Sequence, residues 1–202
     1  MNKRLGRIGS LIVTGTILGF AVCLAVSFDF GSFLICMLLA LGFIMMTAGF
    51  AAESGDDARA SSITAVAFAC VYAVLVLIVY FTQTTVVHLQ LPTDREAVYL
   101  DFSRSGLMFY LDLLGYGLMA LSTFFTGLTV RAKSKADRWL KALLLLHGAF
   151  FPGCFLLPML GVFPPVAAGE MGAGVTVALL FWCAYFLPVG ALAYRHFGTK
   201  RN

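Results

Sequence analysis

One acidic residue of this 202-residue chain, Asp112, lies well inside a long apolar run. Tyr116 follows it at a spacing of four, which places both side chains on the same face of a helix. A carboxylate surrounded by hydrocarbon is costly unless it is paired, hydrated or protonated, so such a group usually serves a function. Asp112 and Tyr116 are therefore candidates for binding a small polar ligand or an ion.

The depth of Asp112 in its helix predicts its neighbours. Counting from Gly106 at about 1.5 Å per residue places Asp112 roughly 9 Å below the end of the run. Tyr80 and Gln83 end the preceding apolar run at a similar depth. We expect an outward-facing cavity lined by Asp112, Tyr116, Tyr80 and Gln83. The alternative is that Asp112 hydrogen-bonds Tyr80 or Gln83 and only holds helices together.

His147 is the other ionisable residue inside an apolar run. It lies about 9 Å from the opposite end of its helix by the same rise, so a direct pair with Asp112 is not expected. His147 either takes part in a hydrated polar relay or donates to a carbonyl of a neighbouring helix. Because no His/Cys spacing fits a metal site, we expect neither a metal nor a cofactor.

The fifth apolar run carries Pro152 and Pro158. Proline lacks the backbone donor of a helix and frees the carbonyl four residues earlier, here those of Gly148 and Cys154. The kink at Pro152 is expected to form the floor of the cavity, where freed carbonyls could bind a ligand. A static bend tolerated by packing is the alternative.

The composition predicts that lipid surrounds most of these residues. The chain is 60% hydrophobic and 12% charged, whereas soluble domains carry about 25% charged residues. Runs of about 20 apolar residues are long enough to cross a bilayer as helices. This excludes a soluble enzyme and a nucleic-acid-binding module, and the five cysteines, all in apolar runs, exclude a loop disulfide framework. The six predicted spans are residues 8–28, 31–52, 62–84, 106–130, 141–162 and 173–194.

Positive charge predicts the orientation of these spans. With a cytoplasmic N-terminus, only Arg95 and Arg104 lie outside. The other cations lie inside, and both termini are then cytoplasmic. These twelve residues are Lys3, Arg4, Arg7, Arg59, Arg131, Lys133, Lys135, Arg138, Lys141, Arg195, Lys200 and Arg201.

The longest connection, the outer loop 85–105, contains the pattern Thr93-Asp94-Arg95-Glu96. This is a capping box, in which a threonine and a glutamate satisfy free backbone N–H groups at the start of a helix. We expect either an extension of the fourth span or a short amphipathic helix there, which caps the bundle or forms a lid over the cavity. In the first span, Gly15-x-x-x-Gly19 predicts a close helix contact inside the bundle.

The segment 109–125, FYLDLLGYGLMALSTFF, resembles a segment of small six-span bacterial inner-membrane proteins with no assigned activity. This resemblance implies a multi-pass protein of the bacterial cytoplasmic membrane and implies no mechanism. It includes both Asp112 and Tyr116.

These observations together predict an all-α bundle of six transmembrane helices in a single domain, with both termini in the cytoplasm. No catalytic motif such as Ser-x-x-Lys, HExxH or a Walker sequence occurs, which argues against an enzyme. Two functions remain. One is binding or transport of a small molecule or ion through the cavity at Asp112. The other is that of a non-catalytic membrane subunit or regulator that recruits a partner protein. The expected partners are the lipid bilayer and either a small polar ligand or a membrane protein, but no nucleic acid.

Overall fold

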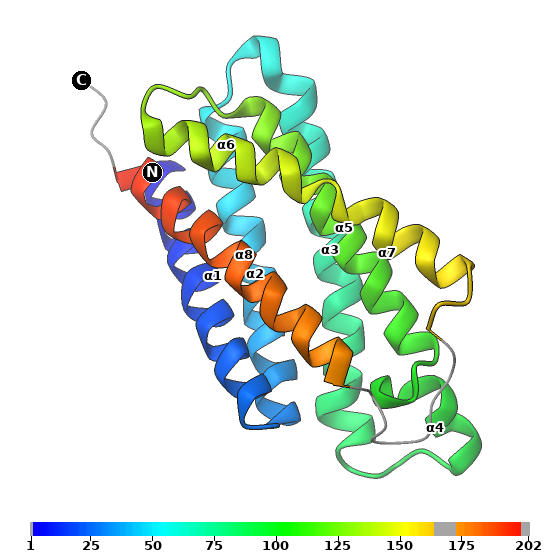
Figure 1. Cartoon of the computed structure of the whole chain (residues 1–202). Helices are drawn as coiled ribbons and strands as arrows, with labels where there is room; N and C mark the ends of the chain where they lie inside the picture. Colours follow the sequence, from blue (N-terminus) through cyan, green and yellow to red (C-terminus); the bar gives the residue numbers. More distant parts are fainter. Residues whose placement is uncertain (1, 164–172, 199–202) are drawn as a thin grey trace.

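The protein is an all-α bundle (Figure 1), described by a computed structural model for residues 2–163 and 173–198, which contain no strand. Each long helix follows an apolar run of the sequence. The elements are α1 (Asn2–Ala25), α2 (Asp29–Glu53), the 3-10 turn η1 (Asp56–Ala58), α3 (Arg59–Thr82), the π-helix η2 (Gln83–Val87), α4 (Asp94–Leu100), the 3-10 turn η3 (Phe102–Arg104), α5 (Leu107–Thr129), α6 (Lys135–His147), α7 (Phe150–Met159) and α8 (Ala173–Gly198).

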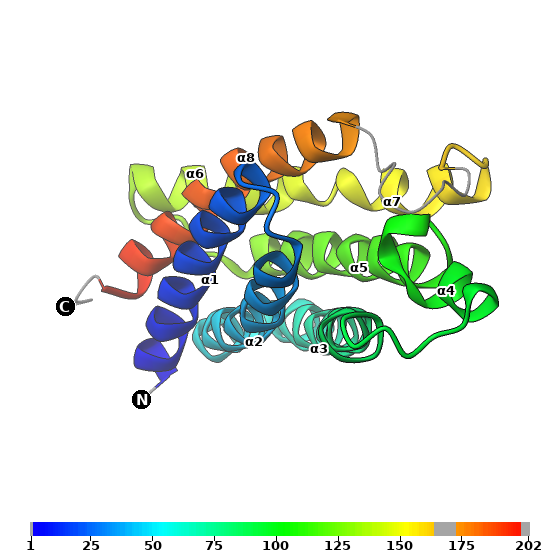
Figure 2. The same cartoon turned by 90° about the horizontal axis from the view of Figure 1, so that it is seen from below.

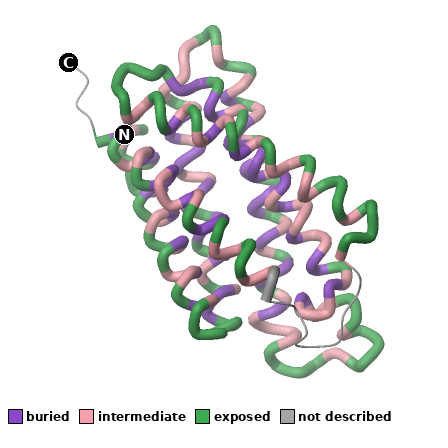
Figure 3. The backbone as a smooth tube through the Cα atoms, in the orientation of Figure 1, coloured by how far each residue is buried: buried purple, intermediate pink, exposed green. Residues whose placement is uncertain are grey.

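Six helical segments are long and apolar enough to cross a membrane, which confirms that part of the predicted fold. The fifth of them combines α6 and α7. Buried residues follow the inside of the bundle, and exposed residues lie along its outer faces and ends (Figure 3). Many of the exposed side chains are large and apolar, such as Leu11, Phe81 and Met159.

The long helices form a closed ring of contacts. Helix α1 contacts α2, α2 contacts α3, and α3 contacts α5. Helix α5 contacts both α6 and α7, and α8 closes the ring by contacting α6 and α1. Figure 2 shows α5 between the α6–α7–α8 side of the bundle and the α2–α3 side. Helix α5 also contacts α2 and α4, so Asp112 is carried by a central element of the bundle.

Helices α1 and α2 pack through glycines, of which the predicted pair supplies only Gly19, whose Cβ position lies 3.0 Å from Ile35 Cδ1 on α2. A Cβ atom at Gly9 would lie 2.7 Å from the carbonyl oxygen of Gly42, and one at Gly49 would lie 2.5 Å from the Cα of Gly6. Such approach is possible only without side chains. Gly15, by contrast, has open space around its Cβ position. The predicted contact of Gly15 is therefore wrong, because that residue faces outward on α1.

The fifth apolar segment begins earlier than predicted and is broken. Helix α6 starts at Lys135 rather than at 141, because Ser134 and Asp137 form a capping box: the Ser134 N–H and hydroxyl both donate to the Asp137 carboxylate. The helix ends at His147, and α7 begins at Phe150 after a two-residue turn. None of the ten residues of α7 is buried, in agreement with its position on the outside of α5.

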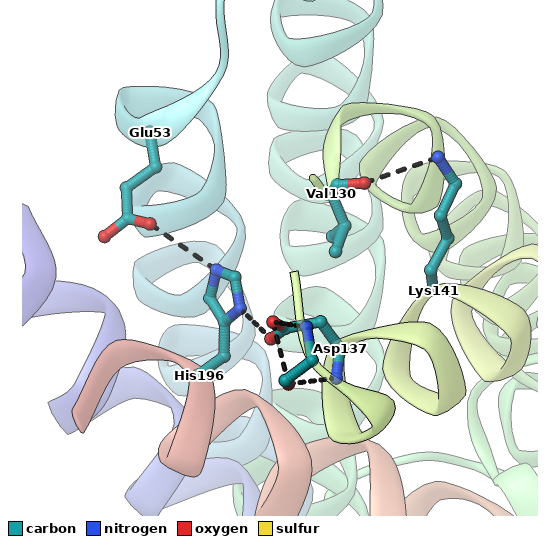
Figure 4. A network of polar contacts seen from close by, with 6 residues as sticks. Glu53, Val130, Asp137, Lys141 and His196 are labelled. Carbon is teal, nitrogen blue, oxygen red and sulfur yellow. Dashed lines mark hydrogen bonds and ion pairs between the residues drawn. The ribbon is translucent and has the colours of Figure 1, made fainter. Parts of the chain in front are cut away.

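A polar cluster closes the end of the bundle that carries both described chain ends. His196, on α8, is nearly buried and lies between two acids (Figure 4). Its Nε2 is 3.4 Å from Glu53 Oε2 and its Nδ1 is 2.6 Å from Asp137 Oδ1. The cluster thereby joins the ends of α2, α6 and α8.

Candidate functional site

A cavity of about 300 Å³ lies at the opposite end of the bundle, away from the chain ends. It is lined from α1, α2, α3 and η2, from the η3 turn, and from α5 and α8. Its polar lining includes Asp112, Tyr80 and Gln83, the residues that depth matching placed together. Most of its remaining wall is apolar or aromatic, including Phe33 and Phe102. The size and lining are those of a small-molecule site.

Two buried oxygen atoms of the cavity lining have no hydrogen-bond partner within the described part of the chain. They are Oδ1 of Asp112, on α5, and Oγ of Ser32, on α2. The residues are only 7% and 5% exposed. Buried polar atoms without partners are rare in folded proteins, since each costs about 1–3 kcal/mol. Both atoms are therefore able to form a hydrogen bond with a molecule in the cavity.

Tyrosines lie beside and behind Asp112. The Tyr80 hydroxyl is next to the carboxyl group and donates a long hydrogen bond of 3.4 Å to the Tyr116 oxygen. Tyr116 in turn contacts the Cys36 sulfur at 3.8 Å and packs edge-on against Tyr72 and Trp182. Tyr116 does not line the cavity. It supports Tyr80 from the inside of the bundle.

Gln83 has a structural task that the sequence did not predict. Its Nε2 donates to the Leu100 carbonyl at 2.8 Å, and its Oε1 accepts from the Phe102 N–H at 3.0 Å. The π-helical turn that begins at Gln83 brings this nearly buried side chain toward the loop. Such turns are frequent at functional sites. The nitrogen and the oxygen of the Gln83 amide are thus bonded to backbone groups where α4 ends and η3 begins. Neither atom is bonded to Asp112.

Helix α4, in the outer loop, begins with the capping residues that the sequence predicts. The Thr93 N–H and hydroxyl each donate to Glu96 Oε2 at 2.8 Å. The hydrogen bond from the Thr93 backbone, more than that from its hydroxyl, holds the pKa of the Glu96 carboxyl below its ordinary value. This stabilisation is present above the ordinary pKa of a glutamate and is lost as the pH falls through the lowered value.

The interpretation of this cavity rests on its geometry. The chain matches no protein-family model, no curated protein and no solved structure. An unpartnered carboxylate oxygen in an aromatic cavity can accept hydrogen bonds from a ligand and can balance a positive charge. Within residues 2–163 and 173–198, no three His, Cys, Asp or Glu side chains are grouped so that they could hold a metal ion.

His147 is bonded through both ring nitrogens. The Thr123 hydroxyl donates to the Ala120 carbonyl at 2.8 Å, so it must accept the proton on His147 Nδ1, which lies 2.8 Å away. His147 Nε2 accepts from Trp182 Nε1 at 3.2 Å. These bonds define a neutral imidazole with its proton on Nδ1. The arrangement stabilises the packing of α5, α6 and α8, and none of these bonds leads to Asp112.

The prolines of the fifth segment lie apart from the cavity. The turn at Gly148 and Ala149 precedes Pro152, but the Gly148 carbonyl accepts from the Phe151 N–H at 3.1 Å and is not free. Pro158 lies inside α7. No residue of α7 lines the cavity, so the Pro152 kink does not form its floor.

Ser32 is the site residue that sequence reasoning missed. A single serine in an apolar run carries no signal of its own, because serines in helices commonly bond the carbonyl four residues earlier. Ser10 does so, donating to the Gly6 carbonyl at 2.8 Å. Ser32 makes no such bond. Only the packing of α2 against its neighbours distinguishes the two serines.

Proposed function

We propose that the protein is an integral membrane protein that binds a small molecule in the cavity at Asp112 and takes part in its transport. The observation that carries this proposal is the buried Oδ1 atom of Asp112, which has no partner within the described residues and belongs to the cavity wall. The other interaction of this carboxyl group is a hydrogen bond with Tyr80, and a buried oxygen that is left without a partner lowers stability unless a ligand completes it.

The exposed apolar side chains of the long helices support insertion into a bilayer. Side chains such as Leu11, Phe81 and Met159 are more than half exposed, and a continuous apolar surface of this kind requires lipid around it. The charge distribution supports a cytoplasmic location for both termini; two of the cations counted, Lys200 and Arg201, lie outside the described residues. We infer a multi-pass protein of the bacterial inner membrane, with the cavity facing outward.

A transport function requires that the cavity be reached from each side of the membrane in turn. The fifth segment is divided into two short helices by the turn at Gly148 and Ala149, and broken helices of this kind are common in transporters. Helix α6 packs on α5 and α8, whereas α7 packs on α5. We infer that the turn between α6 and α7 allows them to shift relative to each other along α5, which carries Asp112.

Labelling of engineered thiols tests the orientation. Arg95, in α4, and Lys133, before α6, are both exposed. In a Cys70→Ser background, which removes the exposed native thiol, a membrane-impermeant maleimide should label Arg95→Cys on intact cells. It should label Lys133→Cys only after the membrane is permeabilised. The reverse pattern would show that the orientation is inverted, and labelling of both variants on intact cells would contradict the six-span topology.

A cavity-filling substitution tests the function. Leu179 lines the cavity from α8, whereas Val177, two residues earlier, is 65% exposed. Protein in phospholipid nanodiscs is incubated with a polar cell extract, washed and analysed by mass spectrometry. The wild type and Val177→Trp should retain the same compound, and Leu179→Trp should lose it, because tryptophan occupies the space of the ligand. Retention of nothing by the wild type, or equal retention by Leu179→Trp, would overturn the proposal.

A further inference from the structure

The chemistry of the cavity restricts the class of ligand, and this inference rests on the binding function proposed above. The two unpartnered oxygens belong to Asp112 and Ser32, on different helices, α5 and α2. A carboxylate oxygen accepts hydrogen bonds, and a serine hydroxyl can accept as well as donate. A ligand that satisfies Oδ1 of Asp112 must therefore present a hydrogen-bond donor, and a donor also satisfies Oγ of Ser32.

Charge restricts the class further. The described lining contains three acids, Asp29, Asp101 and Asp112, one histidine, His88, and neither lysine nor arginine. Asp101 is 3.6 Å from the Arg104 guanidinium. Asp112, deeper in the bundle, has no salt bridge to any described residue. An anionic ligand would be repelled here, whereas a cation would supply the opposite charge that a buried carboxylate needs.

The walls favour an organic cation over an inorganic one. Metal cations such as Ca²⁺ require six or more oxygen ligands, but the deep part of the cavity offers a carboxylate and a hydroxyl among aromatic rings. Phe33 stacks on Tyr80 with ring centroids 5.5 Å apart and meets Phe102 edge-on at 5.9 Å. Aromatic faces attract ammonium groups and bind apolar carbon.

We propose that the ligand is a small protonated organic amine. Its ammonium group donates to Oδ1 of Asp112 and to Oγ of Ser32, and its apolar body lies against Phe33, Tyr80 and Phe102. A cavity of about 300 Å³ accommodates an amine with a single ring. No other contact is required to satisfy both orphaned oxygens.

Three probes of nearly equal size test the class: phenethylamine, 2-phenylethanol and 3-phenylpropionate. Binding to the full chain in nanodiscs is measured at pH 7 by calorimetry. Phenethylamine should bind with a dissociation constant at least about tenfold lower than that of the alcohol, because a charge-assisted hydrogen bond is roughly twice as strong as a neutral one. The carboxylate should not bind.

Two aspartate-to-asparagine substitutions, which change the charge equally, test whether the preference for the amine depends on Asp112. Asp112→Asn should remove the preference for the amine over the alcohol. Asp94→Asn, at an exposed position of α4 outside the cavity lining, should leave it unchanged. Both variants are first shown to be monodisperse and to unfold cooperatively.

The outcomes separate this inference from the proposed function. Equal affinity for the amine and the alcohol, an unchanged preference in Asp112→Asn, or capture of a neutral or anionic compound from the extract would overturn the amine assignment. Each of these would leave the cavity function standing. Failure of the function itself looks different, since the wild type then retains no compound from the extract.

Discussion

Replacing Asp112 with leucine is expected to make the ligand-free protein more stable. The Oδ1 atom is buried and has no partner within the described residues, so the substitution removes an unsatisfied group whose cost is about 1–3 kcal/mol. The cavity beside Asp112 leaves room for the larger leucine side chain. The measurement is thermal unfolding in detergent, followed by tryptophan fluorescence. The same variant is expected to bind no ligand.

The matched control for this prediction is Asp94→Leu, which makes the same change at an exposed site and should not raise stability. The opposite result for Asp112→Leu would also be informative. Removing one partner of a well-paired buried charge lowers stability by about 3–5 kcal/mol. A loss of that size would show that Asp112 holds the bundle together, and the proposed binding role would then be wrong.

Gly9→Ala is expected to weaken the α1–α2 pair strongly, whereas Gly15→Ala is expected to be neutral or stabilising. A Cβ atom at Gly9 would collide with the backbone of Met46 and lie 2.7 Å from the Gly42 carbonyl oxygen. Backbone atoms cannot move aside as a flexible side chain can, so we expect a loss of about 1–3 kcal/mol. At Gly15 nothing lies within 4 Å, and alanine gains about 0.5–1 kcal/mol of helix propensity.

The two glycine variants are compared by the temperature at which each unfolds in the same detergent. Because both are glycine-to-alanine changes on the same helix, the difference between them isolates the contact with α2. Equal unfolding temperatures would mean that α1 and α2 do not approach as closely as the structure has them.

Much of the fold and part of the site could be predicted because long apolar helices follow simple geometry. The apolar runs identified the six long helices, and a fixed rise per residue placed Tyr80, Gln83 and Asp112 at one level. The structure brings these three into the lining of one cavity. Depth along a helix is a local quantity, and sequence determines it well.

Rotation about the helix axes and interactions between distant segments could not be predicted. The spacing of Gly15 and Gly19 resembles a packing motif, yet Gly15 faces outward, because the direction of a helix face depends on its partners. Gln83 has the polarity of a ligand-binding residue, but its amide bonds the loop seventeen to nineteen residues later. Ser32 was missed for the same reason: the absence of a partner is visible only in three dimensions.

The double hydrogen bond of Gln83 has a consequence for how a molecule reaches Asp112. The Gln83 side chain bonds the Leu100 carbonyl and the Phe102 N–H to the end of α3. The segment after α4 therefore cannot move away from α3 without breaking both hydrogen bonds. Asp29 and Phe30, which follow the turn between α1 and α2, border the same cavity and take no part in these two bonds. If the proposed ligand binds, we therefore expect it to enter beside this first hairpin and not through the outer loop.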